Sequence, residues 1–459
     1  MTVFQVIWVL VKIAIMAGFV LNLAAILTWA DRRQSSMIQD RIGPNRAVIR
    51  VFGREFRLAG LLHPLADGLK FFTKEDFRPP RADRLLFRIA PMLALGMVFT
   101  LVATIPFGDT ICPREFRVLW PNVFVGPAVE RWGTCSVDAV RGTSPLDLMI
   151  APLGVGVLFV FAMSGQGVIA AAFAGYSSDN KFSLMGALRA ASQMVSYEVT
   201  LGLSLVGAMM VYGSVRLDDM VRWQQDHAWG IVVQPFAFVL FFAAAVAENK
   251  RIPFDIPEAE SELVSGYFTE YSGMKFGMFY FAEYAEVVTS SMLLVTIFLG
   301  GWTLPFFHRD GLTIQFGEWV ILRWLVPHVW VTLLGVAVFF TKVLVVCGLQ
   351  IFVRWSLPRL RYDQLMRLGW RVLLPASLAN IIITGVLVLG MDSMGPAVAR
   401  ALAVAGHVSH AAVAAGITYG VVRLMADFRK QIRRQPQVLG SSAIRIAKRG
   451  RTEHQAMQS

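Results

Sequence analysis

The sequence predicts an all-α integral membrane protein, and three observations support this fold class. Only 16% of the 459 residues are charged, against about 25% in a typical soluble domain. Apolar runs of about 20 residues, the length that crosses a bilayer, recur along most of the chain. Lys and Arg residues are almost absent from these runs and gather in particular loops and in the C-terminal segment. Because lipid offers no partners for unpaired backbone groups, each run is expected to be helical.

Nine apolar spans are expected to cross the membrane. The first lacks the basic start and the cleavage site of a signal peptide, so we expect a retained helix. The fifth and eighth spans are the shortest, and they contain Pro235 and Pro375. The predicted spans are Val3–Ala30, Leu85–Phe107, Leu148–Gly175, Ala190–Gly213, Trp229–Ala247, Phe276–Trp302, Trp324–Val353, Val372–Met391 and Pro396–Val422.

The basic residues predict that the N-terminus lies outside. The inner segments are then 31–84, 175–190, 248–275, 353–371 and 423–459, and they hold most of the 43 Lys and Arg residues. We therefore expect three parts: a membrane domain of eight helices over 1–392, an extra transmembrane helix within 393–422, and a basic, disordered cytoplasmic tail over 423–459. The net charge of +12 fits this topology and anionic lipid rather than nucleic-acid binding.

One inner segment, from Glu248 to Glu286, is rich in carboxylates. Pro253 and Pro257 exclude a continuous helix at its start. Crowded carboxylates at a membrane boundary cannot all ionise freely, and groups that titrate together suit a proton relay. The alternative is a solvated acidic loop, but interleaved aromatic and apolar side chains favour a functional role. The acids are Glu248, Asp255, Glu258, Glu260, Glu262, Glu270, Glu283 and Glu286.

Two further ionisable residues, Glu198 and Lys342, lie within predicted spans. An intramembrane charge is costly unless it is paired or hydrated, so each is a candidate functional residue. The alternative for Lys342 is a structural pair with a carboxylate on a neighbouring helix.

The first inner loop carries a second group of motifs. A turn at 43–45 lies between Arg41 and Arg46, and Asp31 ends the first helix with two arginines. Leucines at helical spacing then predict an amphipathic helix on the membrane surface, with Asp67 and Lys70 on its other faces. A plain interfacial anchor is the alternative. The leucines are Leu58, Leu61, Leu62, Leu65 and Leu69.

Together these motifs resemble the H subunit of bacterial NADH:quinone oxidoreductase (complex I), which is called subunit 1 in mitochondria. They occur in the family's order over residues 30 to 380. The resemblance rests on IQDRIGPNRA, GLLHPLADGLKFFTKEDFRPPRAD, NKFSLMGALRAASQMVSYEV, AENKRIPFDIPEAESELVSGYFTEYSGMKFGMFYFAEY and FVRWSLPRLRYDQLMRLGWRVLLP.

The resemblance implies a multi-pass subunit of the bacterial cell inner membrane. It would house the quinone-binding tunnel and the first acidic residues that couple quinone reduction to proton translocation. Its partners would be the other subunits of the hydrophilic and membrane arms, membrane lipid, and ubiquinone or menaquinone as substrate. NADH, flavin and iron–sulfur clusters would belong to partner subunits, because three cysteines cannot hold a cluster. We expect no metal site and no complete catalytic site in this chain.

Two sets of residues match the family's motifs. The first matches the mouth and wall of the quinone tunnel: Asp31, Arg32, Arg41, Asp67, Lys70 and Glu75. The second matches the acidic chain and its partners: Glu198, Glu248, Arg251, Asp255, Glu258, Glu260, Glu262, Glu270 and Glu283.

The sequence departs from the family pattern at Asp31, where Glu is usual, and at His63, where Gln is common. The outer loop from Gly108 to Ser144 is long, and its Cys112 and Cys135 are candidates for a disulfide if the loop faces an oxidising compartment; two free thiols are the alternative. The span Pro396–Val422 goes beyond the family's eight helices. It carries His407 and His410, for which close helix packing is favoured over haem ligation.

Two other functions compete with this interpretation. A related membrane anchor of a hydrogenase or formate-hydrogen lyase complex need not reduce quinone, but the complete tunnel-mouth motifs favour the quinone enzyme. A stand-alone ion transporter would show pseudo-symmetric halves with broken helices, and the sequence has no such repeat.

Overall fold

The computed structural model describes residues 3–51, 54–56, 58–110, 147–257, 264–308, 311–316, 319–326 and 328–392. Several expectations lie outside these residues: the extra helix with His407 and His410, the basic tail, and the candidate disulfide between Cys112 and Cys135. Three acids of the expected proton relay, Glu258, Glu260 and Glu262, also lie outside them.

Within the described residues, seven helices are long and apolar enough to cross a membrane, and an eighth is shorter. The seven are α1 (Val3–Ile38), α3 (Arg84–Val102), α6 (Gly156–Ser177), α7 (Lys181–Tyr212), α12 (Gly273–Phe298), α13 (His328–Ser356), and a continuous unit of α14 (Tyr362–Arg367), the π-helical turn η4 (Leu368–Leu373) and α15 (Leu374–Asp392). The shorter helix is α10 (Pro235–Glu248). Each of these helices overlaps one of the eight spans predicted before residue 392, and seven of them are long enough to cross a membrane.

Local sequence explains where the helices differ from the predicted bounds. The Asn180 side chain accepts a hydrogen bond from the Phe182 backbone N–H, so α7 starts at Lys181 rather than Ala190. The fifth span is broken at Gln234 into α9 (Gly230–Val233) and α10, because a residue that precedes proline is disfavoured in helical conformation.

Shorter elements lie outside the bundle. The amphipathic helix predicted in the first inner loop is present as α2 (His63–Thr73), after the 3₁₀ turn η1 (Leu58–Gly60). The helix α8 (Leu217–Asp226) and the 3₁₀ turn η3 (Gly266–Phe268) were not predicted.

Short strands accompany the helices of this α-helical bundle. Strands β1 (Ile49–Val51) and β2 (Arg54–Phe56) form one antiparallel pair, and β3 (Phe307–His308), β4 (Gly311–Phe316) and β5 (Trp319–Leu325) form a three-stranded antiparallel sheet. The seventh span was predicted to start at Trp324, but this residue pairs with Leu312 in the sheet. The apolar stretch 319–325 satisfies its backbone groups by strand pairing, and α13 begins only at His328.

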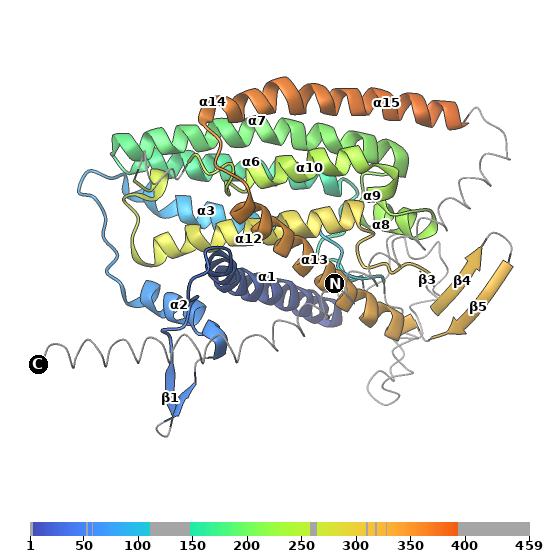
Figure 1. Ribbon diagram of the computed structural model, residues 1–459, viewed down its shortest axis with the longest axis horizontal. Coiled ribbons are helices and arrows are strands. Elements are labelled where there is room, and N and C mark those ends of the chain that lie inside the picture. Colours follow the sequence, from blue (N-terminus) through green and yellow to red (C-terminus); the bar gives the residue numbers. More distant parts are fainter. Residues whose placement is uncertain are drawn as a thin grey trace, which may run out of the picture.

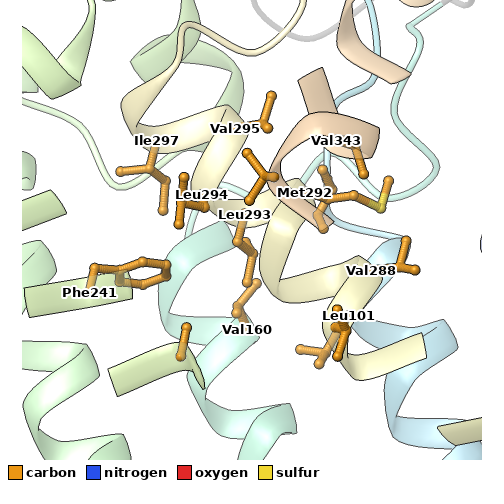
Figure 2. Close-up of a cluster of buried hydrophobic side chains, with 14 of the residues drawn as sticks. Leu101, Val160, Phe241, Val288, Met292, Leu293, Leu294, Val295, Ile297 and Val343 are labelled. Carbon is orange, nitrogen blue, oxygen red and sulfur yellow. The ribbon is translucent and has the colours of Figure 1, made fainter. Parts of the chain in front are cut away.

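Helix α12 is the centre of the bundle (Figure 1). Of its most apolar window 89% is buried, against 22–50% for the other candidate spans. It packs against α1, α2, α3, α8, α10 and α13. Figure 2 shows how side chains from one end of α12 lie among those of four other helices, with Leu101, Val160, Phe241 and Val343 facing Val288, Met292, Leu293 and Leu294. A charged side chain on α12 therefore lies inside the protein rather than in lipid.

The ends of the helices form two faces (Figure 1). One face, called the first face, holds the C-terminal ends of α1, α6, α10 and α13 and the starts of α3, α7 and α12, together with α2. The opposite face holds α8, α9 and the sheet β3–β5. This alternation of helix ends is the one predicted from the apolar spans.

Candidate functional site

The Asp31 carboxylate lies at a junction of three helices. It is 5% exposed, near the C-terminal end of α1. It accepts hydrogen bonds from the Tyr284 hydroxyl of α12 at 2.9 Å and from Trp355 Nε1 of α13 at 2.6 Å, and it forms an ion pair with Arg354. Every one of these partners is itself at least partly buried. Asp31 therefore ties α1 to α12 and α13 through a buried carboxylate.

Two ion pairs continue from this junction across α12. The Arg251 guanidinium lies 4.0 Å from the centre of the Tyr284 ring, and its Nη2 is 3.7 Å from Glu283 Oε2. Lys250 Nζ is 3.4 Å from Glu286 Oε2. Glu283 and Glu286 are one turn apart on α12, so they share a face of that helix. The side chains of Lys250, Glu283 and Glu286 line the same small cavity.

Two more carboxylates extend the series away from Asp31. Glu248, the last residue of α10, lies close enough to Glu198, Glu286 and Lys250 for their charges to interact with it. Glu198, on α7, accepts a hydrogen bond from the Ser164 hydroxyl of α6 at 2.9 Å. We call the whole series the charge row: Asp31, Arg354, Arg251, Glu283, Lys250, Glu286, Glu248 and Glu198.

The loop after α10 brings the two bases to α12. The helix ends at Glu248, and the chain turns at Lys250, which has a positive φ of 55°, before Pro253. The prolines predicted to prevent a continuous helix here do so. Further along, Gly266 and Tyr267 lie against Gly186 of α7 so closely that an added Cβ at Gly186 would be 2.7 Å from Gly266 Cα. This contact holds the end of the loop against the bundle, next to Glu283.

Two further cavities adjoin the charge row. The Asp31 cavity is lined by Leu27, Asp31, Val246, Arg251, Tyr284, Val287, Gln350, Ile351 and Arg354. The Glu248 cavity lies between α3, α6, α7, α10 and α12. Its polar lining consists of Ser164, Glu248, Asn249, Glu286, Thr289 and Ser290, and the rest is apolar. Asp31 thus lines one cavity, and Glu248 and Glu286 line the other, so internal space adjoins the row at two places.

The residues expected at the tunnel mouth divide into two groups. Arg32 Nη2 is 2.5 Å from Asp67 Oδ2, which joins α1 to α2 beside Asp31. Arg41, Lys70 and Glu75 are exposed on the first face. The structure brings Asp31, Arg32 and Asp67 together, and it leaves the other three at the surface.

Helix α2 is held against the start of α12. An added Cβ at Gly277 would lie 3.1 Å from the Phe71 ring, and one at Gly273, which has a φ of +56°, would lie 3.1 Å from the Lys74 carbonyl. Helix α2 has no buried residue, and Leu65 and Leu69 are 63% and 60% exposed. Its apolar face is therefore open at the edge of the bundle, as expected of a helix at a membrane surface.

Two residues expected in the acidic chain lie apart from the charge row. Asp255 forms an ion pair with Arg359, at 2.5 Å, in the segment between α13 and α14. Glu270 accepts a hydrogen bond from Asn180 Nδ2 at 2.6 Å at the start of α7. Both contacts connect loops of the first face.

Backbone carbonyl groups stabilise the intramembrane charge of Lys342. Its Nζ donates to the carbonyls of Leu299, Gly301 and Thr303 at 2.7, 3.0 and 2.6 Å, and lies 4.2 Å from the Trp229 ring centre. These carbonyls follow the C-terminal end of α12, where a positive charge is stabilised. Among the described residues no carboxylate pairs with Lys342; its partners are the carbonyl oxygens at the end of α12, which carry partial negative charge.

A separate polar cavity lies at the opposite face of the bundle, and sequence reasoning did not identify it. It is lined by Asp147, Arg216, Asp218 and Arg222, with apolar neighbours. Burial raises the pKa of Asp147 to about 6, although the charges of Lys12 and Arg222 act in the other direction. Lys12 of α1 donates to the Met149 carbonyl at 2.5 Å.

Sequence reasoning did not assign three members or partners of the charge row to a site: Lys250, Tyr284 and Arg354. Glu286 was predicted as an acid of the segment but was not placed in the acidic chain, although its i, i+3 spacing from Glu283 was an available signal. Nothing local could have identified Arg354, because its partner Asp31 is 323 residues away. Among the described residues, no group of three or more His, Cys, Asp or Glu side chains could hold a metal ion.

Comparison with known proteins identifies close relatives. The chain matches the family model described as NADH dehydrogenase over residues 11–385. An NADH-quinone oxidoreductase H subunit of Geobacter metallireducens is 43% identical over 376 residues, covering 82% of this chain and 95% of the relative. The NADH-quinone oxidoreductase H subunit of Thermomicrobium roseum is 40% identical over 392 residues, covering 82% and 96%. The same-named protein of Flavobacterium johnsoniae is 38% identical over 385 residues, covering 83% and 95%.

Proposed function

The chain belongs to the NADH dehydrogenase family, among the H subunits of NADH-quinone oxidoreductase, and from this premise we propose how it works. We propose that it holds the membrane-embedded part of the quinone site and the first carboxylates that couple quinone reduction to proton translocation. The redox cofactors belong to partner subunits of the complex, and quinone is the substrate. The relatives from Geobacter, Thermomicrobium and Flavobacterium are quinone oxidoreductase subunits, which favours this function over that of a hydrogenase anchor.

The observation that supports this proposal most is the continuity of the charge row. It runs from Asp31, beside the cavity between α1, α12 and α13, to Glu198 on α7. Its members are acids and bases, and half of them lie on the central helix or on the loop after α10. Buried ion pairs contribute little net stability compared with apolar packing, so stability alone does not account for a row of them inside a membrane protein. A role in charge transfer would explain why these ion pairs are buried there.

In the proposed mechanism, the quinone headgroup would be reduced near the first face, next to Asp31, Arg32 and Asp67. Reduction adds negative charge and takes up protons. Arg251 contacts both the Tyr284 ring, which lines the Asp31 cavity, and Glu283, so a change in charge at that cavity alters the balance of the Arg251–Glu283 pair. Glu283 and Glu286 are neighbours, and a shift at one changes the proton affinity of the other. Glu286 and Glu248 would then pass the effect to Glu198.

The proposal also concerns location and orientation. We propose a bacterial inner membrane, with the first face toward the cytoplasm and in contact with the hydrophilic arm. Exposed Arg41, Lys70 and Glu75 lie on that face, where a soluble partner could reach them. The apolar face of α2 would border the lipid from which quinone enters.

Substitution of single carboxylates tests the proposed coupling. Glu286→Gln keeps the size of the side chain but removes its charge, and it should lower NADH:quinone reductase activity and proton translocation by about tenfold or more in the assembled complex. Glu258→Gln or Glu262→Gln should impair both in the same way without loss of assembly. Asp226→Asn, at a position on the opposite face outside the charge row, is the control and should leave both unchanged. Full activity in assembled Glu286→Gln and in a Glu258→Gln, Glu262→Gln double variant would contradict the coupling role.

A further inference from the structure

An uncharged hydrogen-bonded network joins residues that line the Glu248 cavity to a residue that lines the Asp31 cavity. Asn249, directly after α10, and Ser290 of α12 line the Glu248 cavity, whereas Gln350 of α13 lines the Asp31 cavity. Asn249 Nδ2 donates to Gln350 Oε1 at 3.0 Å and to Ser290 Oγ at 2.9 Å. Asn249 and Gln350 are 3% and 6% exposed, so the network lies inside the bundle. It connects the walls of the two cavities directly and bypasses the ion pairs.

Every side-chain donor in this network is already committed to an acceptor. The two N–H groups of Asn249 go to Gln350 and Ser290, and those of Gln350 go to Ser290 at 3.3 Å and Ser291 at 3.0 Å. The hydroxyls of Ser290 and Ser291 both donate to the Val287 carbonyl, at 3.1 and 2.7 Å. The protons of the network are therefore directed toward its own members and toward the α12 backbone, and none of these bonds ends on a carboxylate.

Amide groups cannot hand protons on in the way that carboxyl groups do. A carboxyl group takes up a proton on one oxygen and releases it from the other, whereas the amides of Asn and Gln carry fixed N–H donors and a carbonyl acceptor. Transfer through an amide would require a protonated carbonyl and a deprotonated nitrogen, neither of which is populated near neutral pH. The network thus connects α10, α12 and α13 mechanically without connecting the two cavities for protons.

We propose that the Asn249–Gln350 pair is a proton barrier between the Asp31 cavity and the Glu248 cavity. The barrier forces charge to pass between the cavities through the Arg251–Glu283 and Lys250–Glu286 pairs. A direct path would let protons equilibrate between the cavities without any change in those pairs, and the free energy of quinone reduction would be lost. This inference rests on the proposed function, and it assigns the role of blocking proton transfer to two residues that are neither acidic nor basic.

Substitution by acids tests the barrier. Gln350→Glu introduces into the network a carboxyl group of nearly the same size, which can accept and release protons. Gln350→Met is the matched control, because its side chain has a similar length but cannot accept or release protons. In sealed membrane vesicles containing the assembled complex, Gln350→Glu should keep NADH oxidation but lower the protons translocated per NADH by at least about twofold. Gln350→Met should keep the parental proton yield per NADH, even if its turnover falls.

A second pair of variants, at Asn249, repeats the test in case a Gln350 variant fails to assemble. Asn249→Asp should lower the proton yield as Gln350→Glu does, and Asn249→Leu should not. A parental yield in both acidic variants would overturn the barrier, and so would equal losses of yield in the acidic and apolar variants. Absence of NADH-driven proton translocation in the parental vesicles would instead refute the proposed function itself.

Discussion

At the scale of single residues, the structure distinguishes two kinds of ion pair. Asp31 is 5% exposed and has three side-chain partners, whereas the Arg32–Asp67 pair beside it has side chains that are 40% and 29% exposed. A buried charge that loses its partner remains without solvent, and an exposed one regains water. The two neighbouring pairs should therefore respond differently to the same chemical change.

Asp31→Asn should destabilise the protein strongly, because it leaves the Arg354 guanidinium without a counter-charge in a buried site. Breaking such a pair costs about 3–5 kcal/mol. The matched control, Asp67→Asn, breaks a partly exposed pair and should cost no more than about 1 kcal/mol. Asp31→Glu, which keeps the charge and adds one methylene, should keep the ion pair and most of the stability. Thermal unfolding of the purified complexes measures the three changes, and equal melting temperatures for Asp31→Asn and Asp67→Asn would be inconsistent with this account.

At the scale of elements, the close approach of α7 to the loop before α12 determines where Glu283 can lie. Gly186 of α7 faces the backbone of Gly266 and Tyr267, and Tyr267 Oη is 3.5 Å from Glu283 Oε1. Backbone atoms cannot move aside as the end of a flexible side chain can. Gly202, on the same helix, has no neighbouring atom within 4 Å of an added Cβ.

Gly186→Ala and Gly202→Ala should therefore have opposite effects, although both introduce one methyl group into α7. The first forces the loop away from the helix and should cost about 1–3 kcal/mol, with a loss of quinone reductase activity as Glu283 moves. The second replaces glycine in an open helical position and should be neutral or stabilising by up to about 1 kcal/mol. Melting temperature and activity of the two assembled variants provide the comparison, and a stable, fully active Gly186→Ala protein would show that the contact is not required.

At the scale of the whole molecule, the alternation of helix ends defines two faces but not which of them is inside. The distribution of Lys and Arg predicts that the face with α2 and the loop after α10 is cytoplasmic. The predicted disulfide between Cys112 and Cys135 depends on the same orientation, since it requires the opposite face to lie in an oxidising compartment.

Single-cysteine labelling tests the orientation. In a variant with Cys112, Cys135 and Cys347 replaced by Ser, His227→Cys, exposed directly after α8, should react with a membrane-impermeant maleimide in right-side-out vesicles. Arg81→Cys, exposed between α2 and α3, should react only in inside-out vesicles. The reverse pattern would place the charge row at the outer face and would exclude contact with a cytoplasmic hydrophilic arm.

The sequence by itself determined the membrane class, the approximate positions of the apolar helices before residue 392, the amphipathic α2 and the family. Each of these depends on local composition or on contiguous motifs, because a bilayer selects long apolar helices wherever they occur. The same reasoning misplaced the start of α13, since an apolar stretch of seven residues is compatible with β5 as well as with a helix.

Only the tertiary structure decided which charged groups meet. Asp31 pairs with Arg354 across most of the chain, Lys342 caps the end of α12, and Asn249 beside one cavity donates to Gln350 beside another. Charge partners and cavity walls come from packed helices that are distant in sequence. Hydropathy and spacing describe one helix at a time, so they carry no information about which neighbour it faces.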